Sequence, residues 1–293
     1  MTAGSGERAF YAANYVLLAV ITVTTVFPFL NTVAVSFSGE RAVLSGEVAV
    51  LPVEPTVDTY RSVMKRSPIL VALRNTAFVT VVGTLVNMIL TVLAAYPLSK
   101  QRLRGRSAIL VLITFTMLFG AGMIPDYLLV RSLGLVNTYW ALWLPGAVST
   151  FNMIVLKTFF SGIPESLEDS AMIDGANDLR ILLRIVLPLS LPALATVALF
   201  YAVSHWNSYM NVLIYITSTA KYTLQMRLRQ LLFDSSMMAS ITGTIQDSQD
   251  AQSVAQESIK AASIVIATVP ILLVYPFLQK YFVKGVMIGS IKG

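Results

Sequence analysis

The 293-residue sequence contains no cysteine and a single histidine, and it carries few charged side chains. The absence of cysteine excludes a disulfide framework and any metal site built on thiolates. Charged residues make up 12% of the chain, whereas a soluble domain carries about 25%. Hydrophobic residues reach 56%, and the mean hydropathy is +0.72. This composition predicts a chain that lies mostly within a lipid bilayer.

The sequence also lacks the motifs that mark most catalytic centres. It has no G-x-x-x-x-G-K-[ST] loop for phosphates, no His, Cys, Asp and Glu residues at metal-ligand spacing, and no Ser or Cys nucleophile with a nearby base. We therefore expect no catalytic site, no metal and no cofactor bound by this chain. The net charge of +6 does not indicate nucleic acid as a partner, because the basic residues mostly cluster beside hydrophobic stretches, as membrane topology signals do.

Six stretches are long and apolar enough to cross a bilayer, which requires about 20 mostly apolar residues. They cover approximately residues 11–36, 69–98, 108–124, 138–160, 189–216 and 261–278. The sequence therefore predicts an all-α polytopic membrane protein that forms one transmembrane domain over residues 1–293, with six transmembrane helices.

The short loop after the second stretch gives the clearest topology signal. It carries four positive charges, at Lys100, Arg102, Arg104 and Arg106. Short loops rich in Lys and Arg stay in the cytoplasm. Alternation then places the loop 161–188 inside, the loop 217–260 outside and both termini in the cytoplasm.

A polar segment between the fourth and fifth stretches has the signals of a short helix. Pro164 suits a first helical position, and the carboxylates of Glu165, Glu168 and Asp169 follow in the first turns, where negative charge suits the helix dipole. Gly175 fits a left-handed C-terminal cap. The pattern predicts a helix that ends in a glycine turn.

A second helix is predicted directly after this turn. Asn177 or Asp178 can cap its N-terminus. Apolar residues then repeat at helical spacing, at Leu179, Leu182, Leu183 and Val186. Pro188 and Pro192 are expected to close this helix before the fifth stretch begins.

The same segment resembles the EAA loop of ATP-binding-cassette (ABC) importer permeases. The resemblance rests on Asp169-Ser170-Ala171, on Gly175 and on Ile185-Val186-Leu187-Pro188. It implies a type I ABC importer permease fold and a cytoplasmic loop that docks on an ATPase subunit. The residues expected to take part in ATPase coupling are Glu165, Glu168, Asp169, Ser170, Ala171, Asp174, Gly175 and Pro188. The family's usual Glu is Asp169 here, and Glu168 precedes it, so either carboxylate could make the contact.

The run Ile173-Asp174-Gly175-Ala176 resembles the corresponding run in the carbohydrate branch of this family, which includes the second permease subunit of maltose importers. The resemblance implies a plasma (inner) membrane protein of bacteria. The implied partners are a homologous second permease subunit, an ABC ATPase dimer that holds ATP and Mg, and an extracytoplasmic solute-binding protein. The implied cargo is an oligosaccharide, with an acidic one such as alginate as a candidate. The alternatives are an ABC permease for a non-sugar solute and a secondary transporter.

The fifth stretch contains an unusual run of polar and aromatic residues, namely His205, Trp206, Asn207, Ser208, Tyr209 and Asn211. Polar residues at membrane depth usually face a protein interior or a water-filled cavity. His205, Ser208 and Asn211 are spaced to share approximately one helix face, and aromatic rings can stack on sugars. One interpretation is that this run lines the translocation path. The others are that it bonds helices together or that it lies at the outer interface.

Overall fold

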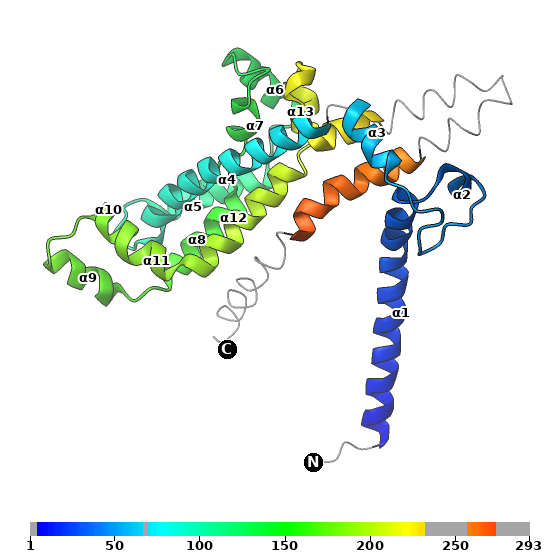
Figure 1. Cartoon of the computed structure of the whole chain (residues 1–293). Coiled ribbons are helices and arrows are strands. Elements are labelled where there is room, and N and C mark those ends of the chain that lie inside the picture. The colour runs from blue at the N-terminus through cyan, green and yellow to red at the C-terminus, as the bar shows by residue number, and fades with distance from the viewer. Residues whose placement is uncertain (1–4, 67–68, 232–256, 274–293) are drawn as a thin grey trace. The chain divides into compact units, whose positions relative to one another are not determined.

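The computed structural model describes residues 5–66, 69–231 and 257–273, and over these residues the chain forms helices and no strand (Figure 1). The chain divides into two compact units. Unit one comprises residues 1–70 and 228–270, and unit two comprises residues 71–227 and 271–293. The predicted all-α class is confirmed.

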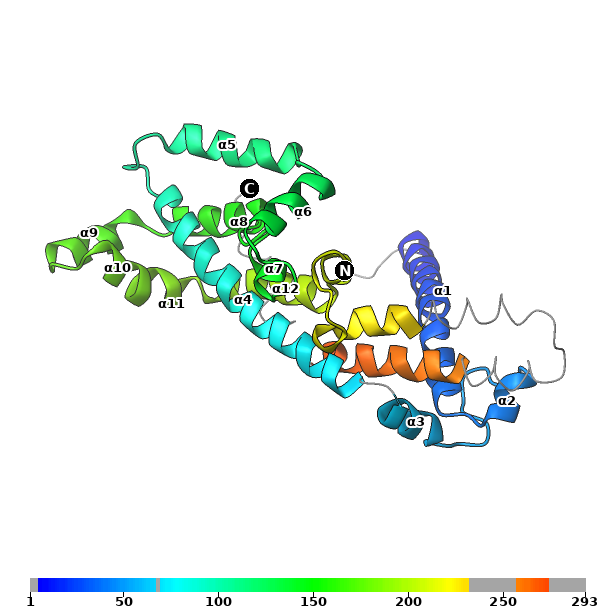
Figure 2. The same ribbon diagram turned by 90° about the horizontal axis from the view of Figure 1, so that it is seen from above.

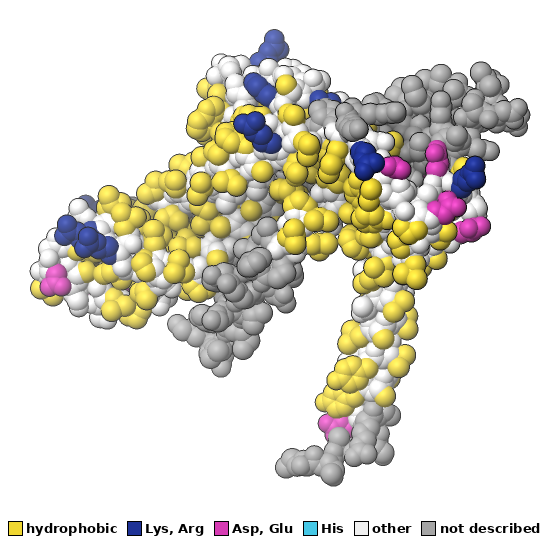
Figure 3. Space-filling model, viewed as in Figure 1, with side chains coloured by type: hydrophobic (Ala, Val, Ile, Leu, Met, Phe, Trp, Pro, Cys, Tyr) yellow, Lys and Arg dark blue, Asp and Glu magenta, His cyan; other side chains and the backbone are white. Residues whose placement is uncertain are grey.

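Unit one contains the long helix α1 (Ser5–Ser36), which continues through Pro28. Residues 10–30 are all exposed, and Figure 3 shows apolar side chains around this helix. Its segment Phe10–Ser36 is long and apolar enough to cross a membrane. An apolar helix that is exposed on all sides suits a lipid environment, because lipid chains can cover what water would not.

The C-terminal end of α1 is tied to the polar segment that follows it. This segment contains α2 (Glu40–Leu44) and α3 (Asp58–Arg66). The Asn31 side chain donates to the carbonyls of Val48 and Ala49, at 3.0 and 2.7 Å. The Ser36 hydroxyl bonds to the Tyr60 hydroxyl at 2.8 Å. These contacts fold residues 37–57 back onto the end of α1.

Unit two is built along α4 (Ile69–Ser99), the second helix that is long and apolar enough to cross a membrane. The same unit contains α5 (Arg106–Leu118), α8 (Thr150–Ser161) and α12 (Leu191–Trp206), and α8 contacts both α5 and α12 (Figure 2). Their shared core includes fully buried residues from α4, α8 and α12, among them Ala95, Met153, Leu156, Phe160 and Val197. This core holds α4, α8 and α12 together.

The third and fourth predicted stretches are each broken in the structure. The helix α5 ends at Leu118, and α6 (Met123–Ser132) follows at an angle of 114°. Gly122, between the two helices, has φ +89°, a left-handed conformation that glycine adopts without steric cost and that suits the break.

The stretch 138–160 contains α7 (Trp140–Trp143) and α8, separated by residues 144–149. Trp143, at the end of α7, is buried, and its indole N–H donates to the Val79 carbonyl at 3.1 Å. The stretch 189–216 contains α12 and α13 (Met210–Tyr215), separated by residues 207–209. Pro145 and Gly146 account for the first of these breaks, because neither favours a continuing helix.

The described residues contain two helices that could span a membrane, or up to four if each bent pair is one span. The second bent pair joins Asp178–Leu189 to Leu191–Trp206 at 85°. The number of six therefore stays a prediction. Residues 232–256 of the expected outer loop, residues 274–278 of the sixth stretch and the C-terminal tail lie outside the described residues. Helical residues 257–273 cover the start of the sixth stretch.

The close approach of helices at Gly83 gives a testable prediction. A Cβ at this position would lie 2.7 Å from the Nε2 atom of His205 and 2.7 Å from a ring carbon of Trp143. Both neighbours are rigid, buried rings, so Gly83→Ala should destabilise the protein by about 1–3 kcal/mol through overpacking. The midpoint of thermal unfolding in detergent should fall by several degrees. Gly6→Ala is the control, because a Cβ there meets nothing within 4 Å in helix α1, and it should not lower the midpoint.

Candidate functional site

The segment between α8 and α12 forms the predicted helix and glycine turn. The helix α9 (Glu165–Ile173) has Pro164 as its N-cap, one position before the first helical position predicted for this proline, and Asp174 as its C-cap. Gly175 has φ +78°, and its N–H bonds to the Met172 carbonyl at 3.0 Å while the Ala176 N–H bonds to the Ala171 carbonyl at 2.9 Å. This pair of bonds is a Schellman motif, which satisfies the last carbonyls of a helix and requires a left-handed residue. The role predicted for Gly175 as a helix cap is confirmed.

The second helix begins as predicted but changes its winding. The Asn177 side chain accepts from the Arg180 N–H at 2.9 Å and caps α10 (Asp178–Ile181). A π-helical turn, η1 (Leu182–Val186), follows, and then the short α11 (Leu187–Leu189). Pro188 lacks an N–H and would crowd the carbonyl four residues before it, so a wider turn at this point relieves the clash.

The wider turn corrects the predicted apolar stripe. Leu182 and Val186 are buried, as expected, whereas Leu179 and Leu183 are exposed. Ile181 takes a place in the core that the 3.6-residue period does not assign to it. Pro188 is exposed and lies within the turn that continues to Leu189, so it does not end the helix itself.

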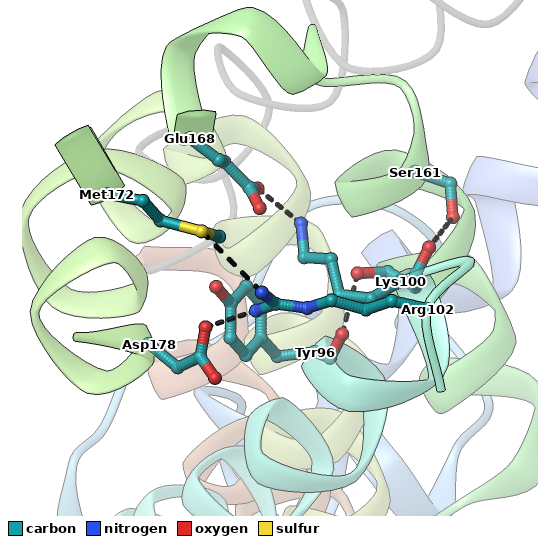
Figure 4. A network of polar contacts seen from close by, with 8 residues as sticks. Tyr96, Lys100, Arg102, Ser161, Glu168, Met172 and Asp178 are labelled. Atoms are coloured by element: carbon teal, nitrogen blue, oxygen red, sulfur yellow. Dashed lines mark hydrogen bonds and ion pairs between the residues drawn. The ribbon is translucent and has the colours of Figure 1, made fainter. Parts of the chain in front are cut away.

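The basic loop after α4 holds the coupling segment, residues 161–188, in place (Figure 4). The Lys100 ammonium forms an ion pair with Glu168 and lies 4.7 Å from the centre of the Tyr96 ring. Arg102 forms an ion pair with Asp178 and also donates to the Met172 sulfur at 3.6 Å. Sequence reasoning treated these basic residues only as a topology signal and missed these contacts.

The two candidate carboxylates have different environments. Glu168 is 4% exposed and is paired within the chain, whereas Asp169 is exposed. The other exposed residues of the predicted coupling set are Glu165, Ser170, Asp174, Gly175 and Pro188, and Ala171 is half-buried. Ile173 is 87% exposed at the end of α9, and Leu167 is 44% exposed. The exposed surface of α9 therefore presents carboxylates together with two aliphatic side chains.

Charge gathers around this end of unit two. Arg180 and Arg184 are exposed within the coupling segment, and Arg104 is exposed in the basic loop. Figure 3 shows basic side chains at the end that carries α9 and α10. A mixed acidic and basic surface with an exposed aliphatic residue has the composition of a protein-docking surface rather than of a reaction centre.

Unit two also contains a cavity of about 750 Å³. Its lining comes from α4, from α7, α8 and the break between them, and from α12, α13 and the break between them. The lining residues are Asn87, Leu142, Pro145, Gly146, Ser149, Phe151, Asn152, Phe200, Tyr201, Ser204, His205, Asn207, Ser208, Tyr209, Met210 and Asn211. No carboxylate is among them, and the only ionisable ring nitrogen is that of His205.

Five of the six residues proposed for the path line this cavity: His205, Asn207, Ser208, Tyr209 and Asn211. The reason we gave was wrong, because α12 ends at Trp206 and the residues after it do not continue one helix face. Instead, these residues lie in the last turn of α12, in the break at residues 207–209 and in the first turn of α13. Trp206 is not part of the lining.

A network around Tyr201 fixes the shape of the cavity. Its hydroxyl bonds to the Thr91 hydroxyl at 2.7 Å and accepts from the Ser149 N–H at 2.9 Å. The Ser149 hydroxyl in turn caps α8 by accepting from the Asn152 N–H. One tyrosine thus joins α4, the start of α8 and α12.

Sequence reasoning missed Asn87, Ser149, Asn152 and Tyr201. Asn87 is 3% exposed, and its Oδ1 atom has no hydrogen-bond partner among the described residues. Asn87 and Asn152 are amide side chains inside apolar stretches, which is a sequence signal that could have found them. Tyr201 gave no such signal, because tyrosine is common in membrane helices.

The chain is similar to known transport proteins over nearly its whole length. The family described as binding-protein-dependent transport system inner membrane component matches residues 69–288. The polygalacturonan/rhamnogalacturonan transport system permease protein YtcP of Bacillus subtilis is 46% identical, over 98% of this chain and 99% of the relative. The trehalose/maltose transport system permease protein MalG of Thermococcus litoralis is 30% identical, over 98% of each chain.

The structure is also similar to a chain from the crystal structure of a bacterial ABC transporter involved in the import of the acidic polysaccharide alginate. The TM-score is 0.88 and the sequence identity is 35%, over 96% of this chain and 99% of the other.

The Tyr201 network predicts a measurable contribution to stability. Tyr201→Phe keeps the ring but leaves the Ser149 N–H and the Thr91 hydroxyl without their shared partner. Unsatisfied buried groups of this kind cost about 1–3 kcal/mol, so the midpoint of thermal unfolding in detergent should fall. Tyr15→Phe, the control, removes the hydroxyl of a tyrosine that is 70% exposed on α1. If both variants unfold at the same temperature, the network does not hold the helices together.

Proposed function

The chain belongs to the family of binding-protein-dependent transport system inner membrane components. We propose that it is one of two permease subunits that together form the path of an importer of acidic oligosaccharides. It is an ABC importer permease with the type I fold, and its relatives include carbohydrate permeases. YtcP is named for polygalacturonan, a polymer of an acidic sugar, and the similar solved structure is of an importer of the acidic polysaccharide alginate.

The lining of the cavity in unit two is the observation that carries this proposal. Its hydroxyl and amide groups can bond to sugar hydroxyls, and its rings, at Phe151, Phe200, Tyr201 and Tyr209, can stack on sugar CH faces. Because the described lining contains no Asp or Glu, a uronate chain would meet no charge of its own sign there. The volume of about 750 Å³ falls within the range of about 300–1,000 Å³ that is typical of small-molecule pockets.

The break residues support the same assignment. At membrane depth, non-helical backbone is tolerated only where protein buries it or where it lines a water-filled cavity. Two such breaks, at residues 144–149 and 207–209, contribute residues to one cavity. Polar side chains that served only as bonds between helices would not require both helices to break beside the same space.

The energy for transport comes from a partner in this proposal. The chain contains no phosphate-binding loop, so ATP and Mg are held by an ATPase dimer that docks on α9. Asp169 and Ile173 are the residues we propose for that contact, because both are exposed on α9. A second permease subunit completes the path, and a soluble binding protein delivers the oligosaccharide from outside.

ATP binding then acts by shifting a two-state equilibrium. Closure of the ATPase dimer favours the outward-open state only if the docked α9 has different contacts in the two states. The coupling residues are therefore proposed to transmit a movement, and the cavity residues to bind sugar, with no covalent chemistry in this chain.

The proposed topology can be tested directly because the chain has no cysteine. Asp174→Cys on the coupling segment and Thr219→Cys in the proposed outer loop are both exposed positions. In intact cells, a membrane-impermeant maleimide should label Thr219→Cys and spare Asp174→Cys until the membrane is permeabilised. Labelling of Asp174→Cys in intact cells would contradict the docking proposal, because an ATPase could not reach the segment.

The proposed cargo predicts a preference among oligosaccharides of equal length. Cells that produce this chain with its second permease, ATPase and binding protein should take up radiolabelled tetragalacturonate or tetramannuronate at least tenfold faster than neutral maltotetraose. Asn87→Leu, which removes a buried amide from the cavity wall, should lower the uptake of the preferred tetramer.

The matched control for Asn87→Leu is Leu85→Ala, a change at an exposed apolar position of α4 away from the cavity lining. Binding-protein affinity for each tetramer is measured separately, so that an effect on delivery is not mistaken for one on the path. Faster uptake of maltotetraose than of both acidic tetramers would refute the assignment to acidic cargo.

A further inference from the structure

The ion pair of Lys100 and Glu168 connects the coupling segment to the long helix α4. The two residues are 68 positions apart in sequence, and their side chains are only 14% and 6% exposed. Lys100 follows directly after α4, and its N–H bonds back to the Pro97 carbonyl at 3.1 Å. The ring of Tyr96, in the last turn of α4, lies below the ammonium. The contact therefore joins α9 to the end of α4 itself (Figure 4).

Burial makes this contact more rigid than the neighbouring one. Breaking a buried ion pair leaves a charge without compensation, so the two partners stay together through a movement. The Arg102–Asp178 pair has side chains that are 52% and 64% exposed, and pairs of that kind contribute little because water and salt screen them. Among the described residues, one buried and one exposed ion pair thus join the same two segments.

The helix α4 leads from this contact to the cavity. Thr91, nine residues before Lys100, bonds to the Tyr201 hydroxyl, and Asn87 lines the cavity. At a rise of about 1.5 Å per residue, Thr91 and Lys100 are separated by about 14 Å along the axis of α4. A displacement of α9 that pulls on Lys100 would therefore act on the end of α4, the helix that also contributes Asn87 to the cavity wall.

We propose that the Lys100–Glu168 pair is the connection through which α9 moves α4, and that Glu168 is a positioning residue rather than a contact of the ATPase. This inference rests on the proposed function. It assigns different roles to two adjacent carboxylates: the exposed Asp169 meets the partner, and the buried Glu168 transmits the movement to the cavity wall.

The test uses the full importer, assembled from this chain, its second permease, its ATPase and its binding protein in proteoliposomes. Met210→Cys, at a cavity position that is 50% exposed, provides the only thiol of this chain. Its rate of labelling by a maleimide is measured without nucleotide and after trapping with ATP and vanadate. Co-purification of the ATPase is measured on the same samples. Neither measurement requires the identity of the sugar.

In the chain that carries Met210→Cys alone, trapping should alter the labelling rate of this thiol at least fivefold. Adding Glu168→Gln should keep the ATPase bound at its normal level and reduce the change in labelling to less than twofold. The charge-swapped variant, Lys100→Glu with Glu168→Lys, should restore most of it. Asp169→Asn should instead lower the amount of ATPase that co-purifies.

The exposed pair supplies the matched control, because Asp178→Asn should leave the labelling change within twofold of normal. A purely structural role for Glu168 would lower the yield of the assembled importer without affecting the labelling change in what remains, and that result would overturn the proposal. So would a charge-swapped variant that assembles but responds no better than Glu168→Gln. Failure of the proposed function looks different: the unmodified chain would then bind no ATPase.

Discussion

The need to satisfy every backbone hydrogen bond governs this structure. Within a bilayer no water is available to replace a lost bond, so a helix can break only where protein or an aqueous cavity compensates it. Unit two breaks its helices at residues 144–149 and 207–209, and it uses both places for one cavity. The Ser149 side chain caps the new start of α8, and Tyr201 accepts the N–H of Ser149. The groups that repair the break thus also form the wall.

The same constraint explains how far the sequence could be interpreted. The long helices α1 and α4 were predictable, because an uninterrupted apolar run of that length has few other solutions. The turn at Gly175 was predictable too, because a left-handed glycine cap depends only on residues that are close to it in the sequence. The break after Trp206 was not, because SHWNSYMN contains neither proline nor glycine. At this end of α12, His205 packs against Gly83, a contact that no local sequence pattern encodes.

The contacts between the basic loop and the coupling segment could not be predicted from the sequence, for a related reason. Lys100 and Arg102 follow the positive-inside rule, and that rule is sufficient to explain their presence in a short loop. A sequence gives no means of knowing that two of these charges also meet Glu168 and Asp178, some 68 and 76 residues away. The family assignment removes the secondary-transporter alternative, which required an acidic residue inside a span for ion coupling. The choice between Glu168 and Asp169, open in the sequence, becomes a question of burial.

The side chains that line the cavity suit a path that releases its cargo better than a site that retains it. A path must bind its cargo well enough to admit it and weakly enough to release it, and fixed charges opposite an anionic chain would hold that chain in place. The described lining offers amides, hydroxyls and rings with a single histidine, so each contact is one neutral hydrogen bond or one stacked ring. Neutral bonds exchange readily with those of water and contribute only about 0.5–1.5 kcal/mol each. In the proposed function, tight and selective recognition therefore lies with the binding protein, and the direction of movement with the ATPase. A permease that leaves both tasks to such partners needs a neutral wall, which the described lining provides, and a helix that connects this wall to the proposed docking surface.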